Sequence, residues 1–176
     1  KLFRKVIGGL SCRDYKDCAV TTPRAFGLSG STISRRYINA TKRKLKELME
    51  RRLERYDFVA LFIDGKTFAD DEIVIAVGIT LQGDKVILGF VQTGTENEGV
   101  CSDFLRGLVR RGFKYEQGLL VVIDGAKGIR SAIEKVFGEK AVVQRCQWHK
   151  RENVVKYLPK ALQPEMRIKL QGAYEN

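Results

Sequence analysis

The sequence predicts a mixed α/β domain, in which an antiparallel group of strands is followed by alternating helices and strands. Short apolar runs of strand length recur between residues 58 and 146, and the segments between the later runs carry apolar residues at helical spacing. A tight turn at Gln82-Gly83-Asp84 joins two strands into a hairpin. The later strands are separated by helices, so we expect them to be parallel.

The first element in the chain is helical and basic. Ala25 to about Arg55 forms two helical pieces separated by Leu28-Ser29-Gly30, and Ser31 or Thr32 caps the longer second piece, whose apolar positions run on to Leu53. The expected elements after it are strands at 58–63, 73–80 and 85–92, a helix at 100–111, a strand at 119–123, a helix at 129–137, a strand at 141–146, and helices at 149–158 and from 163 onward. This is the element order of a ribonuclease H-like fold.

Composition and charge narrow the classes of function. The chain has 176 residues, of which 44% are hydrophobic and 30% charged, a composition typical of globular proteins. Its net charge of +11 favours a polyanionic partner, nucleic acid first and an acidic membrane surface second. No apolar run approaches the roughly 18 residues that span a bilayer, and four irregularly spaced cysteines indicate reduced thiols. We therefore expect a cytoplasmic, nucleoid-associated protein rather than a membrane protein.

Two aspartates follow apolar strands in the same local context. Asp64 comes after the first strand and Asp124 after the fourth, each followed by glycine. Ligands of open sheets bind outside such strand ends, so both carboxylates would share one crevice if these strands are neighbours. Carboxylates are the hard ligands that Mg²⁺ or Mn²⁺ prefers, and two such ions serve phosphoryl transfer. The alternative is that each aspartate only caps or turns the chain.

The segment from Ala25 to Arg36 has the pattern of a helix-turn-helix, with a short helix, a glycine turn and a second helix rich in Ser, Thr and Arg. The alternative is a helical hairpin that packs on the core or forms a dimer. In the helix-turn-helix geometry the residues expected to contact DNA are Ser31, Thr32, Ser34, Arg35 and Arg36.

A further cluster follows the fifth strand. Cys146-Gln147-Trp148-His149 supplies half of a zinc site, which Cys101, or Cys12 with Cys18, would have to complete. Alternatively, Cys146 packs in the core, Trp148 fills a gap and His149 begins a helix; or the cysteine and histidine buttress the crevice of the aspartates. Basic residues that are expected to meet phosphates come next, namely Lys150, Arg151, Lys156 and Lys160.

Three blocks together carry a family resemblance. The segments Tyr56–Lys66, Leu120–Gly128 and Arg145–Lys150 resemble the Mutator-type transposases of bacterial insertion sequences. Leu28–Arg36 is similar to the end of that family's helix-turn-helix, and Asn153–Pro164 to the start of its helical insertion.

The resemblance implies a ribonuclease H-like core whose acidic triad is two aspartates and a glutamate. Asp64 would be the first, Asp124 the second, and Cys146 and His149 the family's Cys-x-x-His signature near the active site. It also implies Mg²⁺ or Mn²⁺ as cofactor, double-stranded DNA of terminal inverted repeats and target as partner, and a homo-oligomer on DNA. Strands would be cut by metal-activated water, and the new 3′-hydroxyl joined to target DNA. The glutamate would lie beyond the insertion, with Glu152 as a rival.

The expected organisation is a basic N-terminal region at 1–55, the first part of the catalytic core at 56–150, and the start of the helical insertion at 151–176, with no role assigned to residues 1–24. We expect a fragment that lacks its third carboxylate and is inactive alone. One alternative is a non-catalytic DNA-binding protein, or a decayed transposase that binds repeats only. Another is a cellular nuclease of the same fold.

Overall fold

The computed structural model describes residues 30–68, 71–94 and 97–175. The chain divides into two compact units, Lys1–Glu50 and Arg51–Asn176, which are considered separately. The predicted domain boundaries at 55/56 and 150/151 stay predictions. Among the described helices, none is both long enough and apolar enough to cross a membrane.

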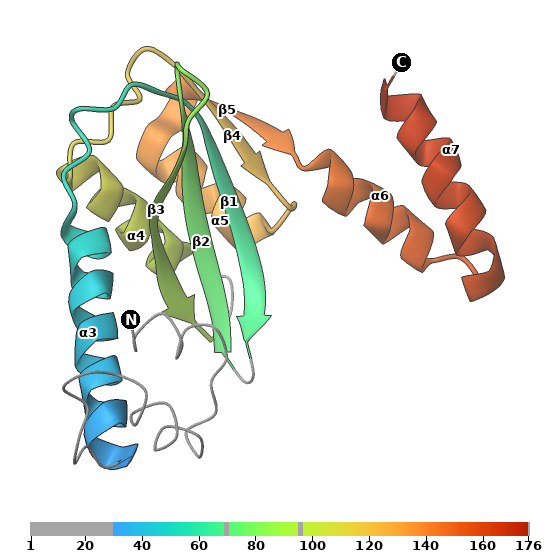
Figure 1. Ribbon diagram of the computed structural model, residues 1–176. Coiled ribbons are helices and arrows are strands. Elements are labelled where there is room, and N and C mark those ends of the chain that lie inside the picture. Colours follow the sequence, from blue (N-terminus) through green and yellow to red (C-terminus); the bar gives the residue numbers. More distant parts are fainter. Residues whose placement is uncertain (1–29, 69–70, 95–96, 176) are drawn as a thin grey trace. The chain divides into compact units, whose positions relative to one another are not determined.

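The first unit contributes one described helix, α3 (Gly30–Glu50) (Figure 1). It begins one or two residues before the predicted caps, so Ser31 and Thr32 lie within its first turn. The shorter helical piece predicted from Ala25 lies outside the described residues. Acidic residues near the C-terminal end of α3 bind neighbouring cations, as in the 2.6 Å pair between Lys44 Nζ and Glu47 Oε2.

The second unit has the element order that the sequence predicts. It comprises β1 (Phe58–Phe68), β2 (Asp71–Thr80), β3 (Lys85–Thr93), α4 (Glu98–Arg110), β4 (Leu119–Ile123), α5 (Lys127–Phe137), η2 (Gly138–Lys140), β5 (Ala141–Arg145), α6 (Gln147–Lys156), η3 (Lys160–Leu162) and α7 (Gln163–Glu175). The predicted α/β class is confirmed, and the arrangement is consistent with a ribonuclease H-like fold.

The five strands form one mixed sheet in the order β3-β2-β1-β4-β5 (Figure 1). Strands joined by short connections, β1 with β2 and β2 with β3, pair antiparallel. Strands joined through helices, β4 with β5, pair parallel, and β4 also lies parallel to β1. The first and fourth strands are therefore neighbours, which is the condition on which the prediction of a shared crevice depended.

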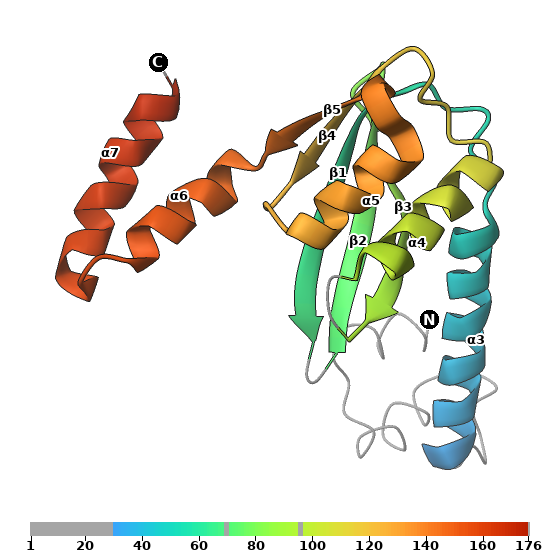
Figure 2. The same ribbon diagram turned by 180° about the vertical axis from the view of Figure 1, so that it is seen from behind.

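Helices α4 and α5 lie side by side on one face of the sheet and enclose the hydrophobic core (Figures 1 and 2). Alternate residues of the central strands point into this core, so Leu61 and Val121 are fully buried. On the opposite face Phe62 and Leu120 remain 43% and 42% exposed. The strands are thus buried on one side, although their continuous apolar runs predict burial on both.

Helical spacing in the sequence assigned Leu53 to the long basic helix, and this prediction is wrong. Helix α3 ends at Glu50, and Leu53 belongs to the irregular segment that opens the second unit. Its side chain is fully buried in the hydrophobic core, and its N–H donates a 2.7 Å hydrogen bond to the carbonyl of Arg111. Tertiary pairing with the end of α4 thus replaces the helical hydrogen bond that sequence spacing suggested.

Candidate active site

The two predicted aspartates occupy matching positions on neighbouring parallel strands. Ile63 of β1 pairs with Ile123 of β4, and Asp64 and Asp124 are the next residues along each strand. Asp124 ends its strand as predicted. Asp64 does not, because β1 loses β4 as a neighbour there but stays paired with β2, where Asp64 lies opposite Ile75. The first aspartate is therefore held in a strand that is paired with β2 and not on a free turn.

Asp64 lies on the sheet face that α4 and α5 leave uncovered. Buried Leu61 and Ile63 alternate with partly exposed Phe62 and Asp64, as the two-residue period of a strand requires. The Asp64 side chain is 52% exposed. A carboxylate in this position keeps its hydration and remains accessible to a cation or a substrate.

Asp124 combines the predicted turn role with a free oxygen. Its Oδ1 accepts a 3.0 Å hydrogen bond from the backbone N–H of Ala126, the N-cap of α5, which offers no side-chain cap of its own. No described residue donates a hydrogen bond to the second oxygen. Gly125 has a φ of +110°, and a Cβ there would lie 2.9 Å from Arg145 Nε. The glycine thus lets the guanidinium of Arg145 approach the backbone beside Asp124.

His149 reaches the same place from α6. The N–H of Cys146 donates a 2.6 Å hydrogen bond to the carbonyl of Ile123, so α6 begins next to the end of β4. Two residues into the helix, His149 Nε2 lies 3.6 Å from Asp64 Oδ1. The histidine side chain is 31% exposed, and its Nδ1 is buried without a hydrogen-bond partner in the described part of the chain. The structure therefore places His149 close to Asp64 and sets Asp124 at the matching position after the neighbouring strand.

Trp148 does not fill a gap in the core, as one of the predicted alternatives required. Its side chain is 55% exposed, and its ring meets the His149 ring edge-on with centroids 4.9 Å apart. Cys146 is half-buried at the N-cap of α6 and lies outside the hydrophobic core cluster. The turn from β5 into α6 thus points the indole outward and the imidazole toward the aspartate.

The donor set fits a hard divalent cation, but the described residues do not complete a site. Two carboxylates at matching strand positions each keep accessible oxygen atoms, the donors that Mg²⁺ and Mn²⁺ prefer. Within residues 30–68, 71–94 and 97–175, no group of three or more His, Cys, Asp or Glu side chains could hold a metal ion. For the predicted zinc half-site, Cys101 is buried in the core, and Cys12 and Cys18 lie outside the described residues.

Glu152, the rival third acid, is committed elsewhere. Its carboxylate forms two hydrogen bonds of 3.1 Å with Arg167 Nε and Nη2, which join α6 to α7. Hydrogen bonding to this guanidinium holds the pKa of Glu152 below the ordinary value of 4.5, and the charge of Arg167 adds to that effect. The described geometry gives Glu152 a structural partner and does not group it with the two aspartates.

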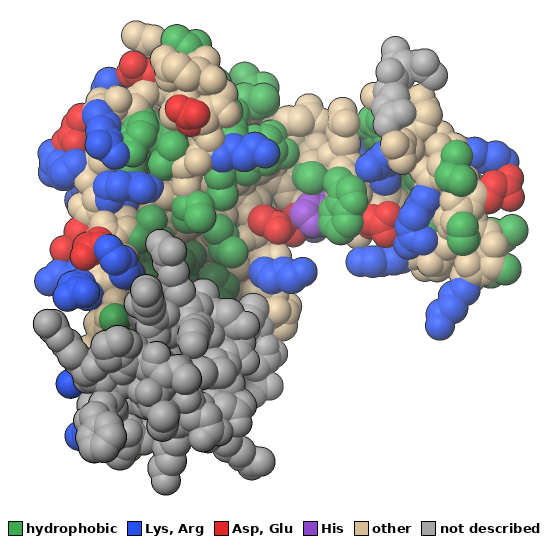
Figure 3. All heavy atoms as spheres, viewed as in Figure 1, with side chains coloured by type: hydrophobic (Ala, Val, Ile, Leu, Met, Phe, Trp, Pro, Cys, Tyr) green, Lys and Arg blue, Asp and Glu red, His purple; other side chains and the backbone are tan. Residues whose placement is uncertain are grey.

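Basic side chains are numerous on α3 and on the α6–α7 segment (Figure 3). In α3, the predicted DNA contacts Arg35 and Arg36 are exposed, and neither takes part in an ion pair with a described residue. Ser31 is exposed, whereas Thr32 and Ser34 are half-buried. These observations leave the proposed contact between α3 and DNA a prediction.

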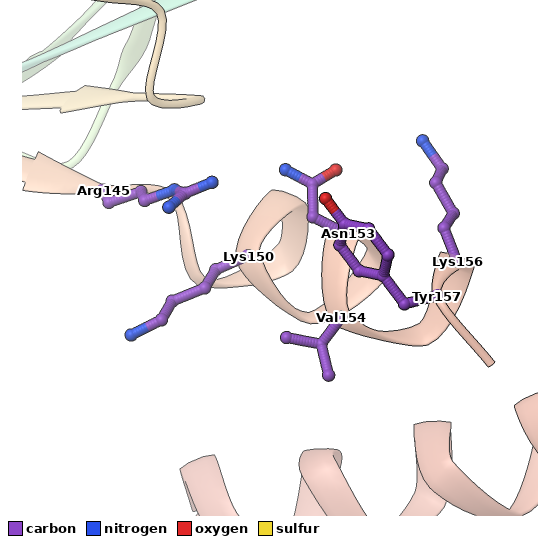
Figure 4. Close-up of a pocket in the computed structure, with 6 residues that line it drawn as sticks. All are labelled: Arg145, Lys150, Asn153, Val154, Lys156 and Tyr157. Carbon is purple, nitrogen blue, oxygen red and sulfur yellow. The ribbon is translucent and has the colours of Figure 1, made fainter.

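On α6, Lys150 is exposed and Arg151 half-buried. Lys150 lines a hollow of about 570 Å³ (Figure 4). Lys156, which was also predicted to meet phosphates, lines the same hollow, whereas sequence reasoning missed the other four lining residues, Arg145, Asn153, Val154 and Tyr157. Two features of the sequence could have identified these residues. They lie at the end of β5 and along α6, and the residues of α6 recur at a helical spacing that puts them on one side of the helix.

Comparison with known proteins agrees with the resemblance. A sequence profile of the transposase Mutator family matches residues 3–176. The chain is 30% identical over 154 residues to the transposase for insertion sequence element IS6120 of Mycolicibacterium smegmatis, covering 84% of this chain and 46% of that protein. It is 32% identical over 171 residues to the transposase for ISRM5 of Rhizobium meliloti, covering 90% and 40%.

A third relative is the transposase for IS256 in transposon Tn4001 of Staphylococcus aureus, which is 36% identical over 101 residues, covering 57% of this chain and 25% of that protein. The chain thus spans less than half the length of these curated relatives. With a profile match over nearly its whole length, the chain belongs to the Mutator family of transposases.

Proposed function

We propose that this chain contributes Asp64 and Asp124 to the site at which a DNA transposase cuts element ends and joins them to target DNA in a metal-dependent reaction. One observation carries the proposal: the parallel pairing of Ile63 with Ile123 brings both aspartates to the same edge of the β1–β4 pair. If the two aspartates served only to form separate turns, nothing would require their strands to pair in this register.

Asp64 and Asp124 are the residues that would hold Mg²⁺ or Mn²⁺. Such an ion, when bound, supplies charge that activates an attacking oxygen and stabilises a leaving oxygen. The hydrogen bond from Ala126 fixes the Asp124 carboxylate and leaves its second oxygen available. Asp64, with half of its side chain exposed, presents its carboxylate from the uncovered face of the sheet.

His149 is proposed as a positioning residue for Asp64. At 3.6 Å, its Nε2 is just beyond hydrogen-bond distance from Oδ1, so a small rotation of either side chain would close the contact. Placing the proton on Nε2 gives Asp64 a donor and leaves a lone pair on the buried Nδ1. A carboxylate held in this way loses less freedom when it binds a cation.

The site proposed here needs a further carboxylate. The described residues do not supply a third ligand, and Glu152 is paired with Arg167. We propose that a glutamate from a part of the transposase outside this chain completes the triad. The first turns of α3 and the basic residues Lys150 and Arg151 would contact double-stranded DNA of the terminal repeats and the target, with the transposase acting as a homo-oligomer.

The test is strand transfer by the full-length transposase on DNA that carries the element's terminal repeats, with Mg²⁺ present. Replacing Asp64 or Asp124 by Asn should lower the rate about 10³-fold, because several kcal/mol of stabilisation are lost at 1.36 kcal/mol per tenfold. Asp84→Asn, in the hairpin turn between β2 and β3, is the matched control and should leave the rate unchanged. Activity retained in the Asp64 and Asp124 variants would overturn the proposal.

A second candidate is a DNA-binding protein without catalysis, favoured by the net charge of +11 and by Arg35 and Arg36 at the start of α3, which are exposed and form no ion pair with a described residue. Titration with Mn²⁺, followed by electron paramagnetic resonance, separates the two candidates. Binding at millimolar or tighter affinity that is lost in Asp64→Asn favours the catalytic role. Unchanged DNA binding with no Mn²⁺ binding favours the second candidate.

A further inference from the structure

A hollow at α6 has a lining of which only Lys150 has a part in the proposed function. It measures about 570 Å³, within the range of about 300–1,000 Å³ that is common for ligand sites. It combines basic, amide and aromatic side chains and contains no acidic one (Figure 4). The lining residues are Arg145, Lys150, Asn153, Val154, Lys156 and Tyr157.

The cations that line this hollow have no acidic residue among the lining residues, although the charge of Lys156 acts on nearby Glu152. Arg145, Lys150 and Lys156 form no ion pair with any described residue. Cations nearby on α7 behave differently: Arg167 binds Glu152, and Lys169 binds Glu165 at 2.6 Å. Three cations line this hollow, and no acidic residue is among its lining residues, a composition that favours an anionic ligand that carries several charges.

The aromatic residue of the hollow, Tyr157, narrows the class of ligand that would bind there. Tyr157, at the C-cap of α6, is 91% exposed, so its ring has almost no packing partner in the described structure. Such a ring gains stabilisation by stacking against a flat apolar surface. Nucleotides offer both features, because phosphates bind cations and base faces stack on aromatic rings. In a duplex these faces are covered by neighbouring bases, so the ring selects an unpaired strand.

The hollow begins beside the candidate active site. The guanidinium of Arg145 lies against Gly125, the residue after Asp124. From there Lys150, Val154 and Tyr157 follow at intervals of four and three residues along α6, a spacing that puts them on one side of the helix. Helix α6 therefore positions His149 near Asp64 and also lines the hollow, which extends along the helix away from the aspartates.

We propose that this hollow binds a single-stranded DNA segment adjoining the phosphate that is cut, with phosphates at the three cations and an unpaired base on the ring of Tyr157. The inference rests on the proposed function for the identity of the polymer as DNA. It adds a strand-binding site, and a preference for unpaired over paired DNA, that the two aspartates do not provide.

The experiment measures binding of a fluorescent oligonucleotide to this chain by anisotropy, without divalent ions, using a single strand and a duplex of the same sequence. Tyr157→Ala should weaken single-strand binding about 10-fold, as expected for one lost base stack, and leave duplex binding unchanged. Tyr157→Phe should bind as the parent does. Lys150→Ala and Lys156→Ala should each reduce the slope of log affinity against log salt by about 0.7 for the single strand.

Matched controls come from outside the hollow: Tyr174→Ala on α7 for the ring, and Lys85→Ala on β3 for the cations. An oligonucleotide with abasic sites should bind the parent as weakly as the intact strand binds Tyr157→Ala. Equal losses for strand and duplex in Tyr157→Ala, or control losses as large as those of the hollow variants, would overturn the proposal. Because Tyr157 is exposed, its replacement should leave the circular dichroism spectrum unchanged, and a changed spectrum would contradict the structure on which the inference depends.

If the proposed catalytic function is wrong, the result differs from the one expected if the proposed strand-binding site is wrong. Asp64→Asn should keep single-strand binding in the absence of metal, whichever way its strand transfer turns out. If the hollow binds single strands but Asp64→Asn retains strand transfer, the catalytic proposal fails and the strand-binding site stands.

Discussion

The sheet with α4 and α5 differs sharply from the arm, defined here as α6 through α7 (Gln147–Glu175). In the former, the central strands and both helices bury a continuous set of apolar side chains. In the arm, Val155 is fully buried, whereas several larger side chains are 50–91% exposed, namely Trp148, Tyr157, Leu162 and Ile168. The first region is stabilised by its own packing, and the arm by a few local contacts such as the Glu152–Arg167 pair.

This contrast assigns different tasks to the two regions. A packed sheet fixes the spacing of the two aspartates, because moving either one would disturb buried neighbours. The arm instead presents apolar, aromatic and basic side chains to whatever binds there, which is typical of surfaces that meet a partner. The arm joins the packed region where His149 approaches Asp64.

The largest expected effect is on catalysis by the isolated chain. The packed region offers two carboxylates, and the described arm adds none to them. This chain alone should therefore show no nicking of supercoiled plasmid above background with Mn²⁺, whereas the full-length transposase should nick it. Nicking by the chain alone that disappears in Asp64→Asn would contradict the expectation of an incomplete site.

The next effect tests stability. Leu61→Ala should lower the free energy of unfolding by about 2–5 kcal/mol, because it leaves a cavity under α4 and α5. Ile168→Ala, at an arm position that is 73% exposed, should change it by less than about 0.5 kcal/mol. Urea denaturation followed by circular dichroism measures both. Equal losses would show that the arm is packed as firmly as the sheet.

A smaller effect is expected on the affinity for metal, which depends on the contact between His149 of the arm and Asp64 of the packed region. His149→Ala should weaken Mn²⁺ binding by about 10–100-fold, the usual loss when the partner of a metal-binding carboxylate is removed. His149→Asn, which can still donate a hydrogen bond, should recover part of the affinity. Calorimetric titration gives the Kd, and the free energy of unfolding should stay unchanged in both variants. No change in Kd for His149→Ala would remove the positioning role.

The smallest effect is a pH dependence confined to the arm. Hydrogen bonding to Arg167 lowers the pKa of Glu152 in the folded chain below its ordinary value of 4.5. The ion pair therefore stabilises the arm fully at pH values above 4.5. That stabilisation is lost as the pH falls through the lowered pKa. Protease cleavage within α7 should therefore rise as the pH falls below 4.5 and through the lowered pKa of Glu152, before the sheet unfolds. In Glu152→Gln, cleavage should already be raised at neutral pH and should respond less to acid.

Several features of the fold were predictable because they depend on local pattern. The apolar run at 119–123 predicted β4 at its observed bounds, and the turn at Gln82-Gly83-Asp84 predicted the β2–β3 hairpin. The neighbouring positions of β1 and β4 followed from the order of elements. Each of these rests on residues that are close in sequence or on the connection between them.

The errors arose where a distant segment decides the outcome. β1 continues past Asp64 because β2 remains paired there, and no residue near Asp64 signals that pairing. Leu53 leaves the helix because Arg111, far along the chain, accepts its N–H. Trp148 points outward because the hydrogen bond from Cys146 to Ile123 fixes where α6 begins.

The sequence by itself determined the class of the fold and the family, and it predicted the two candidate aspartates, because strand periodicity and short motifs depend on consecutive residues. Only the tertiary structure decided the strand register that sets Asp64 and Asp124 at matching positions, that His149 faces Asp64, and that Glu152 binds Arg167. Those relations join residues far apart in the chain. They depend on strand register and helix placement, which packing of the whole core sets.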